Sequence, residues 1–196
     1  QTNCFFLINE DTKELLIIDP ADRAQGIIDW IQSEGLKPVA ILLTHGHFDH
    51  IMAVEGLRKE YQIPMYASKD EVEVLANPQL NVSTMMGAYV SMKADELFAD
   101  GDVLELAGMK LKVISTPGHT IGSVCFYIEE EKMLISGDTL FEASVGRTDF
   151  PTGSSRQLIN SIKTRLFILP EDVNVFPGHG EVTSIAYEKT HNPFIF

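Results

Sequence analysis

Thr44-His45-Gly46-His47-Phe48-Asp49-His50 is the stretch that decides the fold of this chain, because it places three histidines and one aspartate within six consecutive residues. Five apolar residues, Val39-Ala40-Ile41-Leu42-Leu43, lead directly into it and are typical of a buried strand. Alternate residues of an extended segment point the same way, so we expect the side chains of His45, His47 and Asp49 to converge on one point. We expect His50 to point elsewhere and to contribute to a second site nearby. Imidazole and carboxylate groups are the usual ligands of zinc, iron and manganese, so the stretch predicts metal binding at the end of a strand.

Three further segments of the chain pair an apolar, strand-like stretch with a potential ligand at its end. They are 111–115 followed by His119, 133–136 followed by Asp138, and 173–176 followed by His179. A glycine beside each of these ligands lets the backbone turn sharply and approach closely. Together the four segments use five of the six histidines, and we expect the sixth, His191, to be structural or solvated.

The order His45-X-His47-X-Asp49-His50, then His119, Asp138 and His179, resembles the metallo-β-lactamase fold superfamily over nearly the whole chain. The resemblance implies an α/β fold, a four-layer αβ/βα sandwich of two mixed β-sheets with helices outside. It also implies two divalent metal ions, zinc first, with iron or manganese as alternatives. One ion would bind His45, His47 and His119, the other Asp49, His50 and His179, and Asp138 would bridge both. Asp49 would also act in catalysis by orienting a metal-bridging hydroxide.

The composition agrees with one compact domain. The chain has 196 residues, 44% of them hydrophobic, and no linker, repeat or low-complexity tract, so we expect a single domain over 1–196. No apolar stretch is long enough to span a membrane. The chain starts at Gln1 rather than Met, which leaves room for missing N-terminal residues and a removed signal peptide. We expect Cys4 and Cys125 to be buried free thiols in a cytoplasmic protein.

The net charge of −13 argues against one class of partner, nucleic acid, because phosphate binding needs a basic surface. The charge therefore predicts no nucleic-acid partner, the lack of a long apolar stretch predicts no membrane partner, and the resemblance implies a small-molecule substrate.

The pattern along the chain also predicts the scaffold. We expect three hairpins, 5–8 with 15–18, 103–106 with 111–115, and 123–128 with 133–136, and helices at 24–33, 52–61, 70–76 and 154–167. The segment 83–95 carries Met85, Met86, Tyr89 and Met92. We interpret it as a loosely packed core helix, with a lid or pocket wall as the alternative.

Three details help to choose among members of the family that the chain resembles. β-Lactamases of this fold commonly have Cys or Ser where this chain has Asp138, so Asp138 favours the glyoxalase II group or the lactonases. The stretch Ser136-Gly137-Asp138-Thr139-Leu140-Phe141 resembles the glyoxalase II pattern. In Val145-Gly146-Arg147-Thr148-Asp149-Phe150-Pro151, Arg147 occupies the position of a cation that helps to bind the glutathione carboxylate. The alternative for Arg147 is an ion pair with Asp149 that fixes the loop.

The length of the chain matches a particular branch of that family. We expect no C-terminal helical domain of the kind that long glyoxalase II proteins have, because the chain resembles the short bacterial proteins, whose end pattern Glu188-Lys189-Thr190-His191-Asn192-Pro193-Phe194 it shares. The leading hypothesis is a thioester hydrolase acting on a glutathione-derived substrate such as S-lactoylglutathione. The chain has no Gly-X-Ser-X-Gly motif that would supply a serine nucleophile.

Other functions stay open at this stage. Persulfide dioxygenases share the Gly-Arg-Thr-Asp-Phe loop and use one iron, held by residues matching His45, His119 and Asp138. Many of them have Cys at the position of Val145 and differ at Thr139, so these two residues favour the hydrolase. A lactonase-like hydrolase and a non-catalytic metal-binding protein are the remaining alternatives.

Overall fold

A computed structural model describes residues 1–195 of the chain. Its N-terminal half builds a five-stranded sheet with the order β1-β2-β3-β4-β5. β1 pairs antiparallel with β2, and the other neighbours are parallel. The strands are β1 (Phe5–Ile8), β2 (Glu14–Ile18), β3 (Lys37–Leu42), β4 (Met65–Ser68) and β5 (Glu96–Phe98).

The second half of the chain builds a six-stranded sheet with the order β13-β12-β9-β8-β7-β6, in which β9 and β12 are parallel and the other neighbours antiparallel. A small hairpin, β10 with β11, follows β9. These strands are β6 (Val103–Leu106), β7 (Met109–Ser115), β8 (Val124–Ile128), β9 (Met133–Gly137), β10 (Leu140–Phe141), β11 (Ser144–Val145), β12 (Asn174–Pro177) and β13 (Thr183–Ser184).

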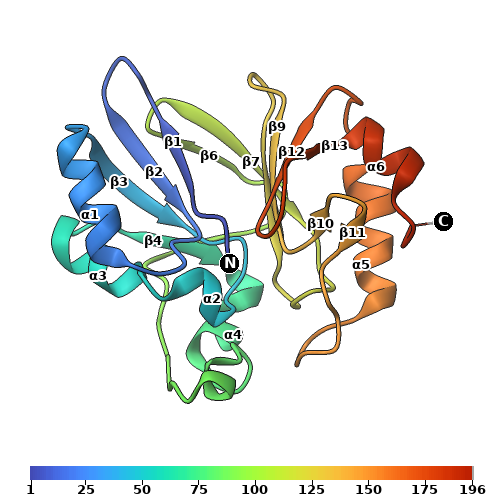
Figure 1. Cartoon of the computed structure of the whole chain (residues 1–196), viewed down its shortest axis with the longest axis horizontal. Coiled ribbons are helices and arrows are strands. Elements are labelled where there is room, and N and C mark those ends of the chain that lie inside the picture. Colours follow the sequence, from blue (N-terminus) through green and yellow to red (C-terminus); the bar gives the residue numbers. More distant parts are fainter. Residues whose placement is uncertain (196) are drawn as a thin grey trace.

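Helices cover the outer face of each sheet, and the two sheets face each other (Figure 1). On the first sheet lie α1 (Ala24–Ser33) and α3 (Val54–Tyr61); on the second lie α5 (Ser155–Ser161), which continues into the π-helical turn η3 (Ile162–Leu166), and α6 (Ile185–His191). The four-layer α/β sandwich expected from the sequence is thereby confirmed.

The side chains of β2 explain why its apolar run is continuous. Leu15 and Ile17 belong to the core beneath α1 and α3, whereas Leu16 and Ile18 belong to the core between the two sheets. Alternate residues of a strand point to opposite faces, so a strand buried on both faces needs apolar residues at every position. All four side chains are fully buried.

Most predicted elements are present, with two corrections. The three hairpins and the helix at 24–33 are confirmed. In place of one helix predicted to start at Met52, the structure has two: α2 (Phe48–Ile51), which begins four residues earlier, and then α3. His47 is the extended residue that precedes α2, and Asp49 lies in its first turn, where exposed N–H groups stabilise a carboxylate. Asp49 and His50 are therefore helical and not part of an extended segment.

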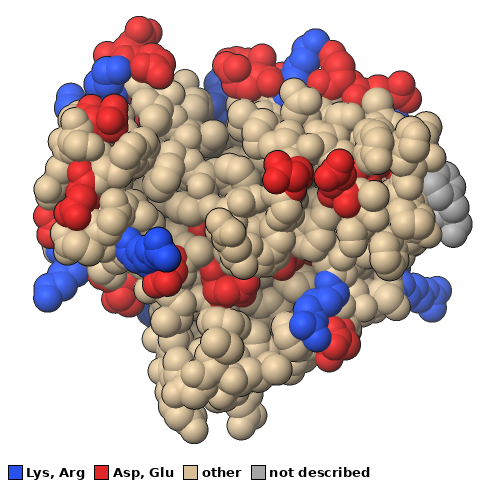
Figure 2. Space-filling view, viewed as in Figure 1, with Lys and Arg blue, Asp and Glu red and all other residues tan. Residues whose placement is uncertain are grey.

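The second correction concerns 83–95, where the expected core helix is wrong. The segment holds a single 3-10 turn, η2 (Ser83–Met86), bounded by Val82 and Gly87, both of which have positive φ. Left-handed residues at both ends stop a helix from extending. Met85 and Met86 are each 68% exposed, whereas Met92 is buried. The segment around η2 forms the lower tip of the molecule in Figure 1. Figure 2 shows no charged side chains on this face of the tip, whereas acidic residues gather at the top of the molecule, over the hairpin turns.

The predicted helix at 70–76 is divided into η1 (Lys69–Glu71) and α4 (Val72–Ala76). Ser154 caps α5 by accepting a hydrogen bond from the Gln157 N–H, as its sequence position predicts. Both cysteines are free thiols; Cys125 is buried and Cys4 partly exposed. Within residues 1–195, no helix combines the length and the apolar character needed to cross a membrane.

Candidate metal centre

The topology brings the predicted ligands to one edge of the sandwich. β7, β9 and β12 run in the same direction, because β7 and β9 both pair antiparallel with β8, and β9 pairs parallel with β12. Their carboxyl ends therefore meet at one edge. His119, Asp138 and His179 follow these ends, and the stretch after β3 carries the four residues of the first run.

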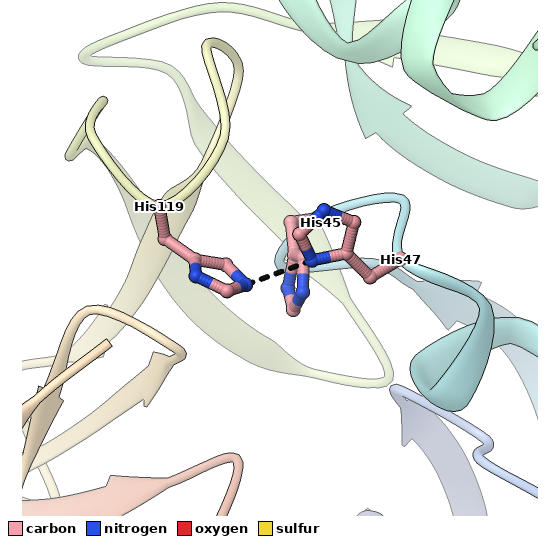
Figure 3. A group of neighbouring side chains, drawn as sticks. All are labelled: His45, His47 and His119. Carbon is pink, nitrogen blue, oxygen red and sulfur yellow. Dashed lines mark hydrogen bonds between the residues drawn. The ribbon is translucent and has the colours of Figure 1, made fainter. Parts of the chain in front are cut away.

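His45, His47 and His119 form what we call the first group (Figure 3). Figure 3 shows His119 reaching from its own loop toward the other two, and the His119 Nε2 and His47 Nδ1 atoms lie 2.8 Å apart. Each of the three is 2% exposed. Burial lowers the pKa of all three, that of His47 to about 3. The first group therefore consists of neutral imidazoles, which is the form that binds metals.

Asp49, His50 and His179 form the second group. His179 Nε2 lies 3.3 Å from Asp49 Oδ2. Hydrogen bonds to Asp138 and Asp49 raise the pKa of His179 to about 10. Burial opposes the ionisation of Asp49, but the hydrogen bond from His179 outweighs it and lowers the Asp49 pKa to about 2. This group therefore contains a carboxylate and carries more charge than the first.

Asp138 lies between the two groups. Its Oδ2 atom is 3.4 Å from His119 Nε2 and 3.3 Å from His179 Nε2, and its Oδ1 atom is 3.4 Å from His50 Nε2. Burial disfavours the charged carboxylate, but the nearby His50 and the hydrogen bond from His179 hold the pKa of Asp138 well below its usual value. One carboxylate thus faces both groups with a different set of contacts at each oxygen.

The chemistry of these atoms fits a pair of divalent cations. Four buried side-chain atoms in the described residues have no hydrogen-bond partner: His45 Nε2, His47 Nε2, His50 Nε2 and Asp138 Oδ1. An unpaired buried polar atom costs about 1–3 kcal/mol, so a fold does not keep four together without a reason. All four belong to the residues that the sequence singled out, and cations that prefer nitrogen and oxygen ligands would satisfy them.

The grouping differs from one expectation. His45, His47 and Asp49 were expected to converge as alternate residues of an extended segment, and this is wrong, because Asp49 lies on α2. Asp49 joins His50 and His179 instead. His191 lies outside both groups; it is exposed and its ring stacks on Tyr187.

Two buried carboxylates that support the centre were not singled out from the sequence. Asp19 accepts hydrogen bonds from the Thr44 N–H and hydroxyl groups and lies 3.0 Å from His50 Nδ1. Its sequence signal was available, since Ile17-Ile18-Asp19 repeats the pattern of an apolar strand that ends in a potential ligand.

Glu71 gave no such signal. Its Oε1 accepts from the Gly46 N–H at 2.9 Å, and its Oε2 accepts from the Thr120 hydroxyl at 3.0 Å and the Gly122 N–H at 2.8 Å. It therefore joins the loop of His45 and His47 to the loop of His119. These partners lie far apart in the sequence, so only the fold reveals them.

Arg147 lies at the rim of the centre. Its guanidinium group makes two hydrogen bonds to Asp149, at 2.8 and 2.7 Å, and lies 3.8 Å from the centre of the Phe150 ring. The Phe150 ring is in turn 5.6 Å from the His47 ring. The ion pair with Asp149 that the sequence left as an alternative is present, and the Arg147 side chain is 56% exposed beside the first group.

Comparisons with known proteins agree with this geometry. The family model described as "Metallo-beta-lactamase superfamily" matches residues 1–179. Among curated relatives, the "Probable metallo-hydrolase YqgX" of Bacillus subtilis is 41% identical over all of this chain and 92% of its own. The "Hydroxyacylglutathione hydrolase GloC" of Haemophilus influenzae is 36% identical over all of this chain and 93% of its own.

Solved structures give the same result. The BLEG-1 B3 metallo-beta-lactamase superposes with a TM-score of 0.95 at 42% identity, covering all of this chain and 94% of its own. TTHA1623 in a di-iron-bound form gives 0.88 at 34%, covering 99% and 95%. ETHE1 from Myxococcus xanthus gives 0.78 at 30%, covering 98% and 78%. With a family model that spans most of its length and relatives that share its whole fold, the chain belongs to the metallo-beta-lactamase superfamily.

Proposed function

We propose that this protein is a metal-dependent hydrolase that cleaves a glutathione thioester such as S-lactoylglutathione. The observation that carries the proposal is the position of Asp138, whose two oxygens face both groups of the centre at 3.3–3.4 Å. A carboxylate shared in this way suits a two-metal site. The 36% identity to a protein named hydroxyacylglutathione hydrolase, over nearly its full length, supports the choice of substrate.

The residue roles follow the two groups. His45, His47 and His119 would hold one ion, Asp49, His50 and His179 the other, and Asp138 would contact both. Zinc suits these imidazole and carboxylate ligands, and the di-iron form of TTHA1623 supports iron as the alternative. When bound, such ions supply an activated water and polarise a carbonyl oxygen.

The chain's own residues complete the chemistry. The contacts of Asp49 with Thr2, His50 and His179 all use Oδ2, so Oδ1 is the oxygen that can orient the attacking water. Hydrolysis forms a C–O bond and breaks the C–S bond, and the sulfur leaves as a thiolate. Thiolates leave more readily than alkoxides, so the reaction needs no strong acid beside the leaving group.

Arg147 and Phe150 would bind the rest of the substrate. A half-exposed guanidinium can bind a carboxylate through two parallel hydrogen bonds, which suits the glycyl or glutamyl end of glutathione. The Phe150 ring, which lies between this cation and His47, would form an apolar wall beside the reacting group.

A second candidate is the mononuclear-iron persulfide dioxygenase. The loop Gly146-Arg147-Thr148-Asp149-Phe150, which resembles that of persulfide dioxygenases, favours it. Its single iron would need His45, His119 and Asp138. BLEG-1 is named a B3 metallo-beta-lactamase, so β-lactam hydrolysis also belongs in the test, although Asp138 argues against it.

The deciding experiment gives the same three substrates to purified protein loaded with zinc and to purified protein loaded with iron. With S-lactoylglutathione, we expect free thiol and lactate. Glutathione persulfide in a parallel sample should cause no O₂ uptake, and a chromogenic β-lactam should stay intact. Oxygen uptake with sulfite formation and no thioester cleavage would replace the proposal with the dioxygenase, and β-lactam opening alone would replace it with a lactamase.

A further inference from the structure

The two groups of the metal centre are held in different ways. The three histidines of the first group are 2% exposed, whereas the side chains of Asp49 and His179 are 35% and 32% exposed. Packing alone can fix a buried side chain, but a partly exposed one keeps its rotamer freedom unless other groups hold it. His50 is fully buried, so it is Asp49 and His179 that need further contacts to keep their positions.

Residues 1–3, which we call the N-terminal strap, supply such contacts. The Thr2 hydroxyl donates to Asp49 Oδ2 at 3.0 Å. His179 donates through Nδ1 to the main-chain oxygen of Gln1, with 2.8 Å between the two atoms. Two of the three side chains in the second group thus have a hydrogen-bond partner in the strap.

The third residue of the strap holds the loop that carries His179. The Asn3 N–H donates to the Gly178 oxygen at 2.8 Å, and the Asn3 side-chain amide donates to the oxygens of Pro177 and Gly180, both at 3.0 Å. These carbonyl groups lie on both sides of His179 in the sequence. Asn3 therefore fixes the backbone of the loop before and after the ligand.

These contacts determine which atoms of the second group face the centre. A carbonyl oxygen only accepts, so the Gln1 contact keeps a proton on His179 Nδ1 and turns Nε2 toward Asp49 and Asp138, each 3.3 Å away; Nε2 is then the nitrogen that a cation would bind in place of its proton. The Thr2 hydroxyl sets the rotation of the Asp49 carboxylate. Outer partners of this kind change metal affinity by about 10- to 100-fold when removed.

The first group has outer partners of its own. His119 donates to the Arg147 main-chain oxygen, and His45 Nδ1 lies 3.1 Å from the Thr44 hydroxyl. In the part of the chain that the structure describes, no hydrogen bond joins the strap to the first group. The strap can thus affect one metal site without the other.

We propose that Thr2 and Asn3 are positioning residues that set the affinity of the second metal site, and that the strap thereby determines whether the protein holds one ion or two. The inference rests on the proposed function only in taking both groups as metal sites. It matters for that function, because the proposed hydrolysis uses both sites, whereas the dioxygenase alternative uses His45, His119 and Asp138.

The test is a Zn²⁺ titration of the metal-free protein by calorimetry, with elemental analysis of the loaded protein. Wild type should bind two ions per chain. Thr2→Val keeps the shape of the side chain but removes the hydroxyl, and should weaken the second ion by about 10- to 100-fold while leaving the first unchanged. Asn3→Ala should act in the same direction. Thr2→Ser restores the hydroxyl and should recover the second ion.

Thr12→Val is the matched control, because Thr12 is an exposed threonine in the β1–β2 turn whose hydroxyl donates to Glu14. It should leave both affinities unchanged. Wild-type affinity for both ions in Thr2→Val and Asn3→Ala, equal weakening of both ions, or a wild-type protein that saturates with one ion would each overturn the inference. The titration uses no substrate, so a protein that binds two ions but cleaves no thioester refutes the proposed function and leaves the strap in place.

Discussion

His119 donates its Nδ1 proton to the main-chain oxygen of Arg147, with 2.7 Å between the two atoms. Because the carbonyl only accepts, this bond fixes the tautomer of His119 and leaves its Nε2 lone pair facing His47 and Asp138. The residue that the sequence singles out for its side-chain charge thus also orients the imidazole of a proposed metal ligand through its backbone. The loop at 145–151 therefore helps to build the candidate metal centre, in addition to the substrate-binding role proposed for the Arg147 side chain.

This relationship makes Gly146 critical. A Cβ atom at Gly146 would lie 1.8 Å from the Asp138 main-chain oxygen and 3.3 Å from His119 Nδ1. Gly146→Ala should therefore move the loop, break the His119–Arg147 hydrogen bond and destabilise the protein by about 1–3 kcal/mol. We expect weaker zinc binding in a calorimetric titration, with urea unfolding to measure the stability.

Gly26→Ala is the control for this substitution. Gly26 is an exposed residue of α1, and the nearest atom to its added Cβ would be 3.9 Å away. Alanine at this position should stabilise the helix by up to about 1 kcal/mol and leave zinc affinity unchanged. If Gly146→Ala bound zinc as tightly as wild type, the loop would not orient His119.

The position of Asp138 gives a second prediction. Asp138→Ala removes the carboxylate that faces both groups, so metal content and thioester hydrolysis should fall together. Loss of a direct ligand should exceed the loss of an outer partner, which predicts a decrease in activity on the order of 100-fold or more. Asp172→Ala, which removes an exposed carboxylate paired with Lys132, should change neither quantity. An Asp138→Ala protein with normal metal content would show that this carboxylate is no ligand.

The parts of the centre that the sequence revealed are those in which adjacent residues carry the signal. Strands such as β2 and β3 are continuous apolar runs because both of their faces are buried, and the ligands follow strand ends that the topology brings together. The orientation of Asp49 was missed because helix α2 begins inside the ligand run, at a position that the hydrophobic period does not mark.

Other features of the centre depend on contacts between distant segments. Glu71 meets Gly46 and Thr120 across separations of 25 and 49 residues, and Thr2 meets Asp49 across 47. No local pattern distinguishes such a glutamate or threonine from an exposed one. The methionines of the turn at 83–86 resemble core residues and so predict a core helix, whereas the left-handed backbone of Gly87 ends the helix after a single turn.

The Arg147 side chain allows a test of substrate binding. Arg147→Ala should raise KM for S-lactoylglutathione by about 10-fold, which corresponds to about 1.4 kcal/mol, with little change in kcat, because in the proposed function the cation would contact a carboxylate remote from the reacting group. Asp149→Asn should release Arg147 from its ion pair and lower KM or leave it unchanged. If KM were unchanged in Arg147→Ala and both variants were less stable, the Arg147–Asp149 ion pair would fix the loop and take no part in substrate binding.

Glu71 gives a prediction about pH. Burial raises the pKa of this carboxyl from 4.5 to about 7 and outweighs its three hydrogen bonds, so the folded protein binds the proton more tightly than the unfolded chain does. Its contribution to stability is therefore fully present below pH 4.5 and is lost as the pH rises to about 7. The loss amounts to as much as about 3 kcal/mol, since one pKa unit corresponds to about 1.4 kcal/mol.

The measurement is urea unfolding of the metal-free protein from pH 4 to 8, for wild type and Glu71→Gln. Other groups titrate in both proteins, so the difference between their free energies of unfolding isolates Glu71. Wild type should lose stability relative to the variant between pH 4.5 and 7, and the difference should be constant above pH 7. A difference that instead grows in favour of wild type as the pH rises would mean that the donors at Gly46, Thr120 and Gly122 stabilise the ionised carboxylate. Glu71 would then join the two ligand loops as a charged group.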